Sequence, residues 1–190
     1  MLEVLWHGRG GQGAFTAARL LGSSGAFGTG RYSLAFPSFG PERRGAPMRA
    51  VTKIDTRPIG NRSAVAHGNY VVYLDGTLFG PGWERELKSD GLVLVNSRDT
   101  FDDARIISID ADGISTELLG RPIPNTVFLG AIAALDERIA QADVERSIRE
   151  YMPPKLHAKN IAVVEAVLAE FEELKQGGVP SHIKGIWPAR

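Results

Sequence analysis

A glycine-rich segment near the N-terminus, Gly8-Arg-Gly-Gly-Gln-Gly13, limits the fold more than any other part of the sequence. It follows an apolar run over residues 2–7 that is typical of a strand, and it opens residues 12–21, where alanine and leucine recur at helical spacing. Gly8, Gly10 and Gly13 form the pattern G-x-G-x-x-G. A strand, a glycine turn and a helix in this order predict the first unit of an α/β fold, whose helix N-terminus favours an anion.

The same segment disfavours a nicotinamide dinucleotide as the ligand. Such a site needs an acidic residue about 20 positions further on, which binds the ribose hydroxyls. The sequence has no Asp or Glu between Glu3 and Glu42. Two interpretations stay open: a loop that approaches another anionic ligand, with Arg9 and Gln12 as polar contacts, or a glycine turn that serves close packing of the strand on the helix.

Apolar runs and helical periodicity predict alternating strands and helices along the rest of the chain. Strands are expected at residues 2–7, 32–36, 48–54, 70–74, 92–95 and 106–109. Helices are expected at residues 12–21, 78–87, 126–139 and 143–151, and from about residue 155 to residue 175. These elements predict a single α/β domain with a mostly parallel open sheet flanked by helices and a Rossmann-like first βαβ unit. The domain is expected to span residues 1–175, with an extended C-terminal tail at residues 176–190.

Single residues mark where several of these elements begin or end. Gly22, Gly25, Gly28 and Gly30 are expected to break the first helix, and Pro37 to stop the second strand. Asn125 and Asp143 are expected to cap the helices that follow them.

Polar residues beside strand ends are the candidates for chemistry. Asp75 directly follows the apolar run at 70–74, so it is either a site residue at the carboxyl edge of the sheet or a helix cap. His7 precedes the glycine loop, where it either faces the site or bonds to the backbone. The four histidines lack metal-ligand spacing, and Ser38 lacks a nearby His-and-acid signature, so we expect no metal site and no catalytic residue on this chain.

Residues 36–47, Phe-Pro-Ser-Phe-Gly-Pro-Glu-Arg-Arg-Gly-Ala-Pro, form the second candidate segment. Their prolines and glycines predict a long shaped loop that displays Glu42, Arg43 and Arg44. Residues 1–62 carry nine basic and three acidic residues, a net charge of +6, against −6 for the remainder. Eight of the nine bases are arginine, which suits two-point binding of phosphate or carboxylate, so this end of the chain is expected to meet an anion or a partner surface.

Composition excludes several classes of protein. The chain has no cysteine, so it cannot itself supply disulfides, thiol catalysis or cysteine ligands for zinc or iron–sulfur clusters. Its formal net charge of zero disfavours a nucleic-acid binder. No apolar run approaches the roughly 18 residues of a membrane span, and Glu3 in a start without basic residues disfavours a secretion signal. We therefore expect a cytoplasmic protein with neither nucleic acid nor membrane as a partner.

Three segments carry a family resemblance: Trp6-His-Gly-Arg-Gly-Gly-Gln-Gly13, Ala35-Phe-Pro-Ser-Phe-Gly-Pro-Glu-Arg-Arg-Gly-Ala-Pro-Met-Arg-Ala50 and Pro124-Asn-Thr-Val-Phe-Leu-Gly-Ala131. Together they closely resemble the gamma subunit of 2-oxoacid:ferredoxin oxidoreductases, the family to which pyruvate synthase belongs. The resemblance keeps the family's order and spacing and runs from residue 2 to about residue 175.

The resemblance implies a complex that decarboxylates a 2-oxoacid on thiamine diphosphate, passes electrons through [4Fe-4S] clusters and transfers the acyl group to coenzyme A. In the family, thiamine diphosphate lies between the alpha and beta subunits, and the clusters lie in the beta and ferredoxin-like delta subunits. This chain would hold no cofactor alone, complete the complex and contribute to the coenzyme A site. The binding candidates are Gly8, Arg9, Gly10, Gly11, Gln12, Gly13, Arg43 and Arg44.

Two other functions are kept beside this one. In the first, the chain is a purely structural subunit without a small-molecule site, and Glu42, Arg43 and Arg44 pair with charges on the alpha or beta subunit. In the second, it is a free-standing enzyme that binds a flavin or a nucleotide, which the missing acid after the second strand disfavours. Pyruvate, 2-oxoglutarate, branched-chain and aryl 2-oxoacids are all open as substrates of the complex.

Overall fold

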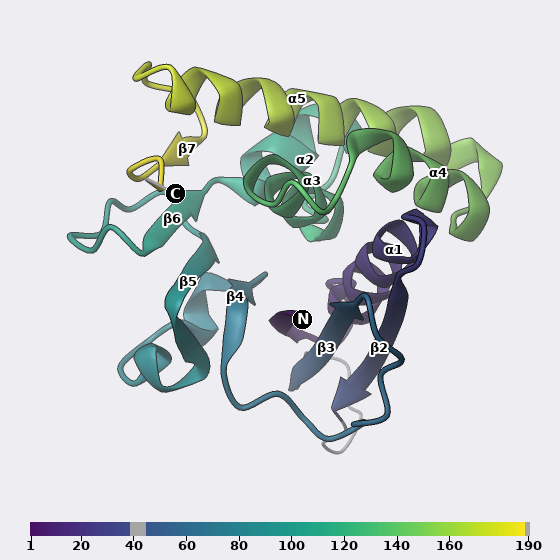
Figure 1. Cartoon of the computed structure of the whole chain (residues 1–190). Coiled ribbons are helices and arrows are strands. Elements are labelled where there is room, and N and C mark those ends of the chain that lie inside the picture. The colour runs from purple at the N-terminus through teal and green to yellow at the C-terminus, as the bar shows by residue number, and fades with distance from the viewer. Residues whose placement is uncertain (39–44, 189–190) are drawn as a thin grey trace.

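A seven-stranded sheet and five α-helices form the structure, a computed structural model that describes residues 1–38 and 45–188 (Figure 1). The strands are β1 (Leu2–Arg9), β2 (Tyr32–Ser38), β3 (Pro47–Asp55), β4 (Gly68–Tyr73), β5 (Leu87–Asn96), β6 (Ile106–Ile109) and β7 (Ile183–Lys184). The α-helices are α1 (Ala14–Phe27), α2 (Ala111–Leu119), α3 (Asn125–Leu135), α4 (Gln141–Tyr151) and α5 (His157–Lys175). Short 3-10 helices are η1 (Gly76–Leu78), η2 (Trp83–Glu86) and η3 (Pro154–Leu156).

The sheet has the strand order β2-β3-β1-β4-β5-β6-β7. Strands β1, β4, β5 and β6 pair in parallel, whereas β3 and β7 run antiparallel to their neighbours. The predicted α/β class with a mostly parallel open sheet is confirmed. One detail differs from a simple Rossmann unit: β3 lies between β1 and β2, so the two strands that α1 connects are not neighbours.

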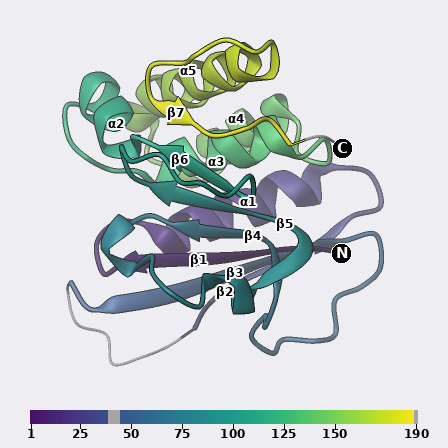
Figure 2. The same cartoon turned by 90° about the vertical axis from the view of Figure 1, so that its left-hand side faces the viewer.

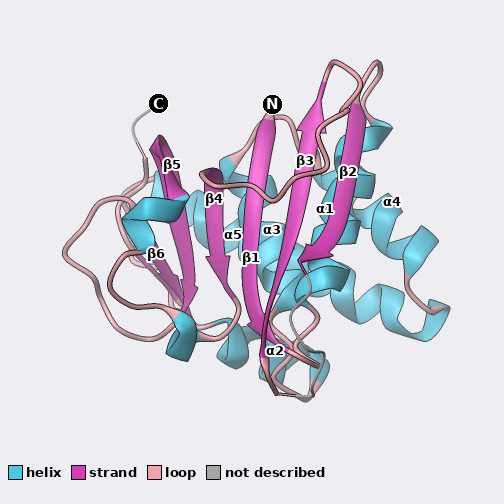
Figure 3. Ribbon diagram, turned by 90° about the horizontal axis from the view of Figure 1, so that it is seen from below, coloured by secondary structure: helices cyan, strands magenta, loops and turns pink. Residues whose placement is uncertain are grey.

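All five α-helices cover one face of the sheet, as two perpendicular views show (Figures 1 and 2). The main core lies between this face and the helices, where Leu2, Val4 and Trp6 of β1 belong to one cluster with buried residues of α1 and α3. Seen from the other side, the strands lie in front and are crossed by loops and short 3-10 helices (Figure 3). A second, smaller core forms there around Leu5 and Tyr73. The sheet is therefore flanked by α-helices on one face.

Helix α1 runs through Gly22 and Gly25, so the expectation that these glycines break it was wrong. Gly25 sits where α1 presses on β3: a Cβ atom there would lie 2.3 Å from Cδ1 of Ile54. The glycine is needed for close packing of helix on sheet, and the packing offsets its low helix propensity. The helix ends at Gly28, its C-cap.

Two other local expectations were also wrong. Pro37 does not stop β2, which continues to Ser38, because in the described residues β2 lies at the edge of the sheet, where a missing N–H is tolerated. Residues 78–87 form no α-helix; Gly80, Pro81 and Gly82 separate η1 from η2, and β5 already begins at residue 87.

Helix boundaries differ from the predicted caps by a residue or two. Helix α3 has Pro124 as its N-cap and Asn125 as its first residue, and α4 begins at Gln141, before Asp143. Helix α2 was not predicted at all; its signal was Asp110, whose side chain accepts a hydrogen bond from the Gly113 N–H.

The C-terminal tail, described to residue 188, lies against the rest of the chain. Ile183 is buried and pairs with Ile109, so β7 covers the edge of β6. Trp187 packs edge-on against Phe171 of α5, with 6.4 Å between ring centroids. The predicted division at residue 175 stays a prediction.

His182 connects this tail to helices α5 and α2 through its side chain. Its Nδ1 lies 2.5 Å from Glu170 of α5, its Nε2 lies 3.4 Å from Glu117 of α2, and its backbone N–H donates to Glu170. Partial burial works to lower the pKa of His182, but the two carboxylates outweigh it and raise the pKa above its ordinary value.

We expect the tail to loosen as pH rises. A raised pKa in the folded state means that the stabilisation is complete below the ordinary pKa of 6.5 and is lost as pH increases through the raised value. Hydrogen exchange at residues 182–187, corrected for the intrinsic rate, should become several-fold faster across that range. In His182→Gln the pH dependence should vanish, while His157→Gln, whose Nε2 bonds to the Met152 carbonyl, should keep it. Equal pH profiles in the wild type and His182→Gln would contradict the role of His182.

Candidate functional site

The glycine loop turns from β1 into α1 at the carboxyl ends of the parallel strands. Strand β1 ends with Gly8 and Arg9. After it, Gly11 and Gly13 have φ values of 101° and 83°, and Gly13 is the N-cap of α1. Such positive φ values suit glycine, so the sequence determines the turn. A Cβ on Gly11 would meet nothing within 4 Å, and residue 11 is exposed, so the loop presents open backbone to a ligand or a partner.

The loop is paired with the connection between β2 and β3. The Gly10 N–H donates to the Ala46 carbonyl over 3.1 Å, and the Gly45 N–H donates to the Gly10 carbonyl over 3.3 Å. The first and second candidate segments of the sequence therefore meet. Arg43 and Arg44, predicted as binding residues, lie outside the described residues.

Helix α3 meets the same loop. Asn125 lies directly over Gly13: a Cβ on Gly13 would lie 2.7 Å from Nδ2 of Asn125. The three segments that carry the family resemblance, far apart in sequence, therefore meet at the N-terminus of α1.

Arg9 and Gln12, the two predicted polar contacts, are bound to Asp75. Arg9 donates from Nε to the Asp75 carboxylate over 2.9 Å, and Gln12 donates from Nε2 over 3.1 Å. The Gln12 side-chain oxygen accepts from the Arg9 backbone N–H, and Arg9 also donates to Thr77. Asp75 is thus a cap, since it also accepts from the Thr77 N–H at the start of η1, and its role as a site residue stays a prediction.

The Asp75 carboxylate is held in its charged form. Burial works to raise the pKa of Asp75, but hydrogen bonds from Thr77, Gln12 and Arg9 outweigh it, so the pKa lies below its ordinary value. Beside it, a crevice of about 550 Å³ opens at the strand ends, lined by Gln12, Asp75, Asp99 and Asp112 among others. Because Arg9 is neutralised and three carboxylates line the crevice, the crevice itself does not favour an anion.

A second polar cluster lies on the face of the sheet without α-helices. Nε2 of His7 lies 2.8 Å from one carboxylate oxygen of Glu86 without hydrogen-bond alignment, and Arg49 lies 2.7 Å from the other carboxylate oxygen. The His7 ring stacks on Tyr73, with 4.6 Å between centroids. Sequence reasoning identified His7 but missed its partner Glu86, which it placed in a helix 79 positions away.

Glu86 binds this cluster as a carboxylate. The contact with His7 lowers the pKa of Glu86 below its ordinary value, against the effect of burial, and Arg49 adds to the lowering. Burial and the Glu86 charge raise the pKa of Tyr73 well above its ordinary value, which keeps the phenol protonated.

Replacing Glu86 by glutamine is expected to lower the free energy of unfolding at neutral pH by about 1–3 kcal/mol, the usual value of a hydrogen bond to a charged group, because the carboxylate accepts from the Tyr73 hydroxyl and pairs with Arg49. Since the folded-state pKa is lowered, the carboxylate stabilises the protein above its ordinary pKa of 4.5, and this stabilisation is lost as pH falls further. Urea unfolding at pH 7 and pH 4 measures both effects. Glu84→Gln, an exposed neighbour on η2, should change little, and equal losses in the two variants would contradict the ionic cluster.

The described residues contain no helix that is long and apolar enough to cross a membrane. Within the same residues, no group of three or more His, Asp or Glu side chains is arranged for a metal ion. Fold and site together define an open α/β domain with a glycine loop at the carboxyl ends of its parallel strands, of the kind that supports a ligand or a partner subunit.

Comparison with known proteins narrows this class. The family of pyruvate ferredoxin/flavodoxin oxidoreductases matches residues 3–170. Pyruvate synthase subunit PorC from Methanothermobacter marburgensis is 46% identical over 94% of this chain and 100% of its own length. The pyruvate/ketoisovalerate oxidoreductases common subunit gamma from Thermococcus kodakarensis is 39% identical over 87% of this chain and 94% of its own. The crystal structure of pyruvate oxidoreductase subunit PORC from Thermotoga maritima superposes with a TM-score of 0.77 and 31% identity, over 96% of this chain and 97% of that chain.

The chain belongs to the pyruvate ferredoxin/flavodoxin oxidoreductase family, as the gamma subunit of a pyruvate or 2-oxoacid:ferredoxin oxidoreductase complex. The family resemblance of the three sequence segments is thereby confirmed.

Proposed function

We propose that the complex oxidatively decarboxylates a 2-oxoacid on thiamine diphosphate, passes the electrons through [4Fe-4S] clusters and releases the product as an acyl-coenzyme A. In this proposal, the alpha, beta and ferredoxin-like delta subunits hold the thiamine diphosphate and the clusters, and the assembly works in the cytoplasm. This chain completes the complex and supplies part of the coenzyme A site. The lack of cysteine in the chain supports this division, because [4Fe-4S] clusters are ligated by cysteine.

One observation carries the coenzyme A part of the proposal: the backbone pairing of Gly10 with Gly45 and Ala46. It brings Gly45 and Ala46, which directly follow Arg43 and Arg44 in the sequence, to the glycine loop beside the first turn of α1. That turn has no acidic residue and no side-chain cap, so its positive dipole end is not neutralised from within. Coenzyme A carries several phosphate charges, which two arginines next to open backbone N–H groups would bind by charge-assisted hydrogen bonds.

The other candidate is a purely structural subunit. Its support is the closed network of Arg9, Gln12 and Asp75, in which the polar groups of the loop satisfy one another without a ligand. In that case Arg43 and Arg44 would pair with acidic groups of another subunit.

Isolation of the chain from its native host without oxygen tests the proposal. We expect partners that bind thiamine diphosphate and partners rich in cysteine, and an assembly that forms acyl-coenzyme A from one of a panel of 2-oxoacids. A chain recovered alone with its own flavin would contradict the proposal. An active assembly whose coenzyme A affinity is independent of this chain would favour the structural alternative.

A further inference from the structure

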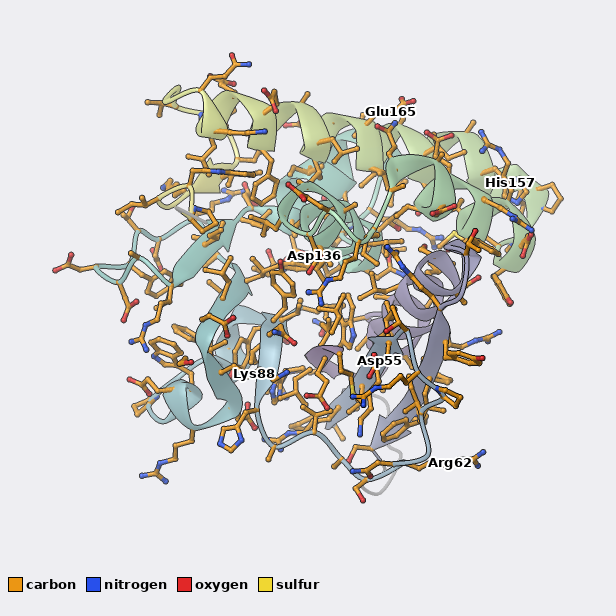
Figure 4. All side chains as sticks on the ribbon, in the orientation of Figure 1. Asp55, Arg62, Lys88, Asp136, His157 and Glu165 are labelled. Atoms are coloured by element: carbon orange, nitrogen blue, oxygen red, sulfur yellow. The ribbon has the colours of Figure 1, made fainter. Side chains whose placement is uncertain are left out.

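A separate pocket lies where the first turns of α1 and α3 meet the junction between α4 and α5. It has a volume of about 270 Å³, and its lining includes Thr16, Arg121, Asn125, Tyr151 and Lys159. Figure 4 labels His157, the first residue of α5, at this end of the molecule. Unlike the acidic crevice beside Asp75, this pocket has no carboxylate in its lining.

Asn125 offers an unused donor to this pocket. The residue is 6% exposed, and its side-chain oxygen accepts from the Thr126 N–H, which fixes the orientation of the amide. In the described part of the chain, its Nδ2 group has no hydrogen-bond acceptor. Asn160, which also lines the pocket, is different because its oxygen and its nitrogen are both bonded. Because this residue lines the pocket and its amide nitrogen is not one of the fully enclosed unpaired atoms, the nitrogen can donate to a ligand acceptor or a bound water in the pocket.

Positive charge gathers around this donor. Arg121 and Lys159 are exposed at the rim, and within residues 1–38 and 45–188 neither forms an ion pair. The guanidinium of Arg19 lies 5.5 Å from the ring centroid of Tyr151, which lines the pocket. Helices α1 and α3 both lack an acidic residue in the first turn, so two positive dipole ends add to these charges.

The remaining walls are apolar, with Ile123, Met152 and Leu156 beside the Tyr151 ring. Apolar walls with a few convergent donors are typical of small-molecule sites, and two free cations beside a neutral donor suit a dianion rather than a single carboxylate.

We propose that this pocket binds a phosphate ester with an aromatic or apolar body, of the nucleotide class. A ring packs between Tyr151 and the aliphatic side chains, and the phosphate is bound by Arg121, Lys159 and the Asn125 amide. Two sources supply this chemistry: the nucleotide end of coenzyme A, which rests on the proposed function, and a free nucleotide, which does not.

Titration calorimetry on the full chain at low salt tests the pocket, with adenosine 3′,5′-bisphosphate, ADP and coenzyme A as probes. Saturable binding of at least one probe is expected. In Arg121→Ala and Lys159→Ala the affinity should fall about tenfold each, in line with a hydrogen bond to a charged group. Lys155→Ala, an exposed cation on η3 that does not line the pocket, should leave it unchanged. Binding of none of the probes, or equal affinity in the wild type and the double variant, would overturn the inference.

The probes separate the two sources. Binding of coenzyme A and the bisphosphate but not ADP assigns the pocket to coenzyme A, whereas similar affinity for ADP assigns it to a free nucleotide. The experiment distinguishes failure of the inference from failure of the proposed function. If the whole complex binds coenzyme A with an affinity unchanged by the Arg121 and Lys159 variants, and the free chain binds no probe, the inference is wrong and the proposed function stands.

Discussion

Replacing Asp75 by alanine is expected to lower the free energy of unfolding by about 3 kcal/mol, because one carboxylate caps η1 and accepts charge-assisted bonds from the glycine loop. Its two oxygens accept from Arg9, Gln12 and Thr77 over 2.6–3.1 Å. Without it, the Arg9 guanidinium and the Gln12 amide lose their shared acceptor, so the glycine loop should also exchange its amide hydrogens faster. Urea unfolding and hydrogen exchange measure the two effects.

Asp99→Ala is the matched control for this change. Asp99 lines the same crevice, but it is exposed and bonds locally to Ser97, so its loss should cost less than about 0.5 kcal/mol, as for most surface substitutions.

The pH dependence of the stability provides a second test of Asp75. Since the pKa of Asp75 is lowered in the folded state, its stabilisation is present above the ordinary value of 3.8 and is lost as pH falls below it. The alanine variant should therefore lose less stability in acid than the wild type does. A small effect of Asp75→Ala at pH 7 would show that Asp75 does not fix the loop.

Replacing Gly25 by alanine is expected to destabilise the protein by about 2 kcal/mol. The added Cβ would lie 2.3, 2.8 and 2.9 Å from three carbons of the Ile54 side chain, so Ile54 or the helix must move. Overpacking of this kind costs roughly 1–3 kcal/mol and exceeds the gain of up to about 1 kcal/mol in helix propensity. Thermal or urea unfolding measures the change.

Gly22→Ala on the same helix should have the opposite sign. There the added Cβ would lie 3.4 Å from Ala35 and 3.7 Å from Ser33 and Thr52, which is ordinary contact. The gain in helix propensity then dominates, and the variant should be more stable than the wild type by up to about 1 kcal/mol. Equal effects of the two substitutions would show that α1 does not rest on β3 as described.

The fold was predictable where the signal was local and periodic. The alternation of Met48, Ala50, Thr52 and Ile54 is typical of a strand, and these residues lie on the helix-covered face of β3. The apolar run at 70–74 corresponds to the central strand β4. The prediction from glycine positions was wrong where packing sets the role of the glycine. In isolation Gly25 indicates the end of a helix, and its contact with Ile54 exists once α1 lies on the sheet.

The candidate site was predictable to the same extent. Asp75 and the glycine loop were identified because each directly follows an apolar strand. That Arg9 and Gln12 are bonded to Asp75 depends on the neighbouring positions of β1 and β4, which no local pattern contains. Asn125 was recognised as part of a helix start, but its position over Gly13 follows from tertiary packing across 112 residues. The roles of the predicted binding residues stay a prediction.

Coenzyme A binding to the anaerobically assembled complex tests the central claim most directly. The Arg43→Ala and Arg44→Ala complexes should bind coenzyme A at least about tenfold more weakly than the wild type, as expected for loss of a charged hydrogen-bond donor. Arg57→Ala and Arg62→Ala are the matched controls, because they follow β3 at the opposite end of the sheet from the glycine loop, and their complexes should keep wild-type affinity. Unchanged affinity in both the Arg43 and the Arg44 variants would contradict a coenzyme A site on this chain and leave those arginines as contacts between subunits.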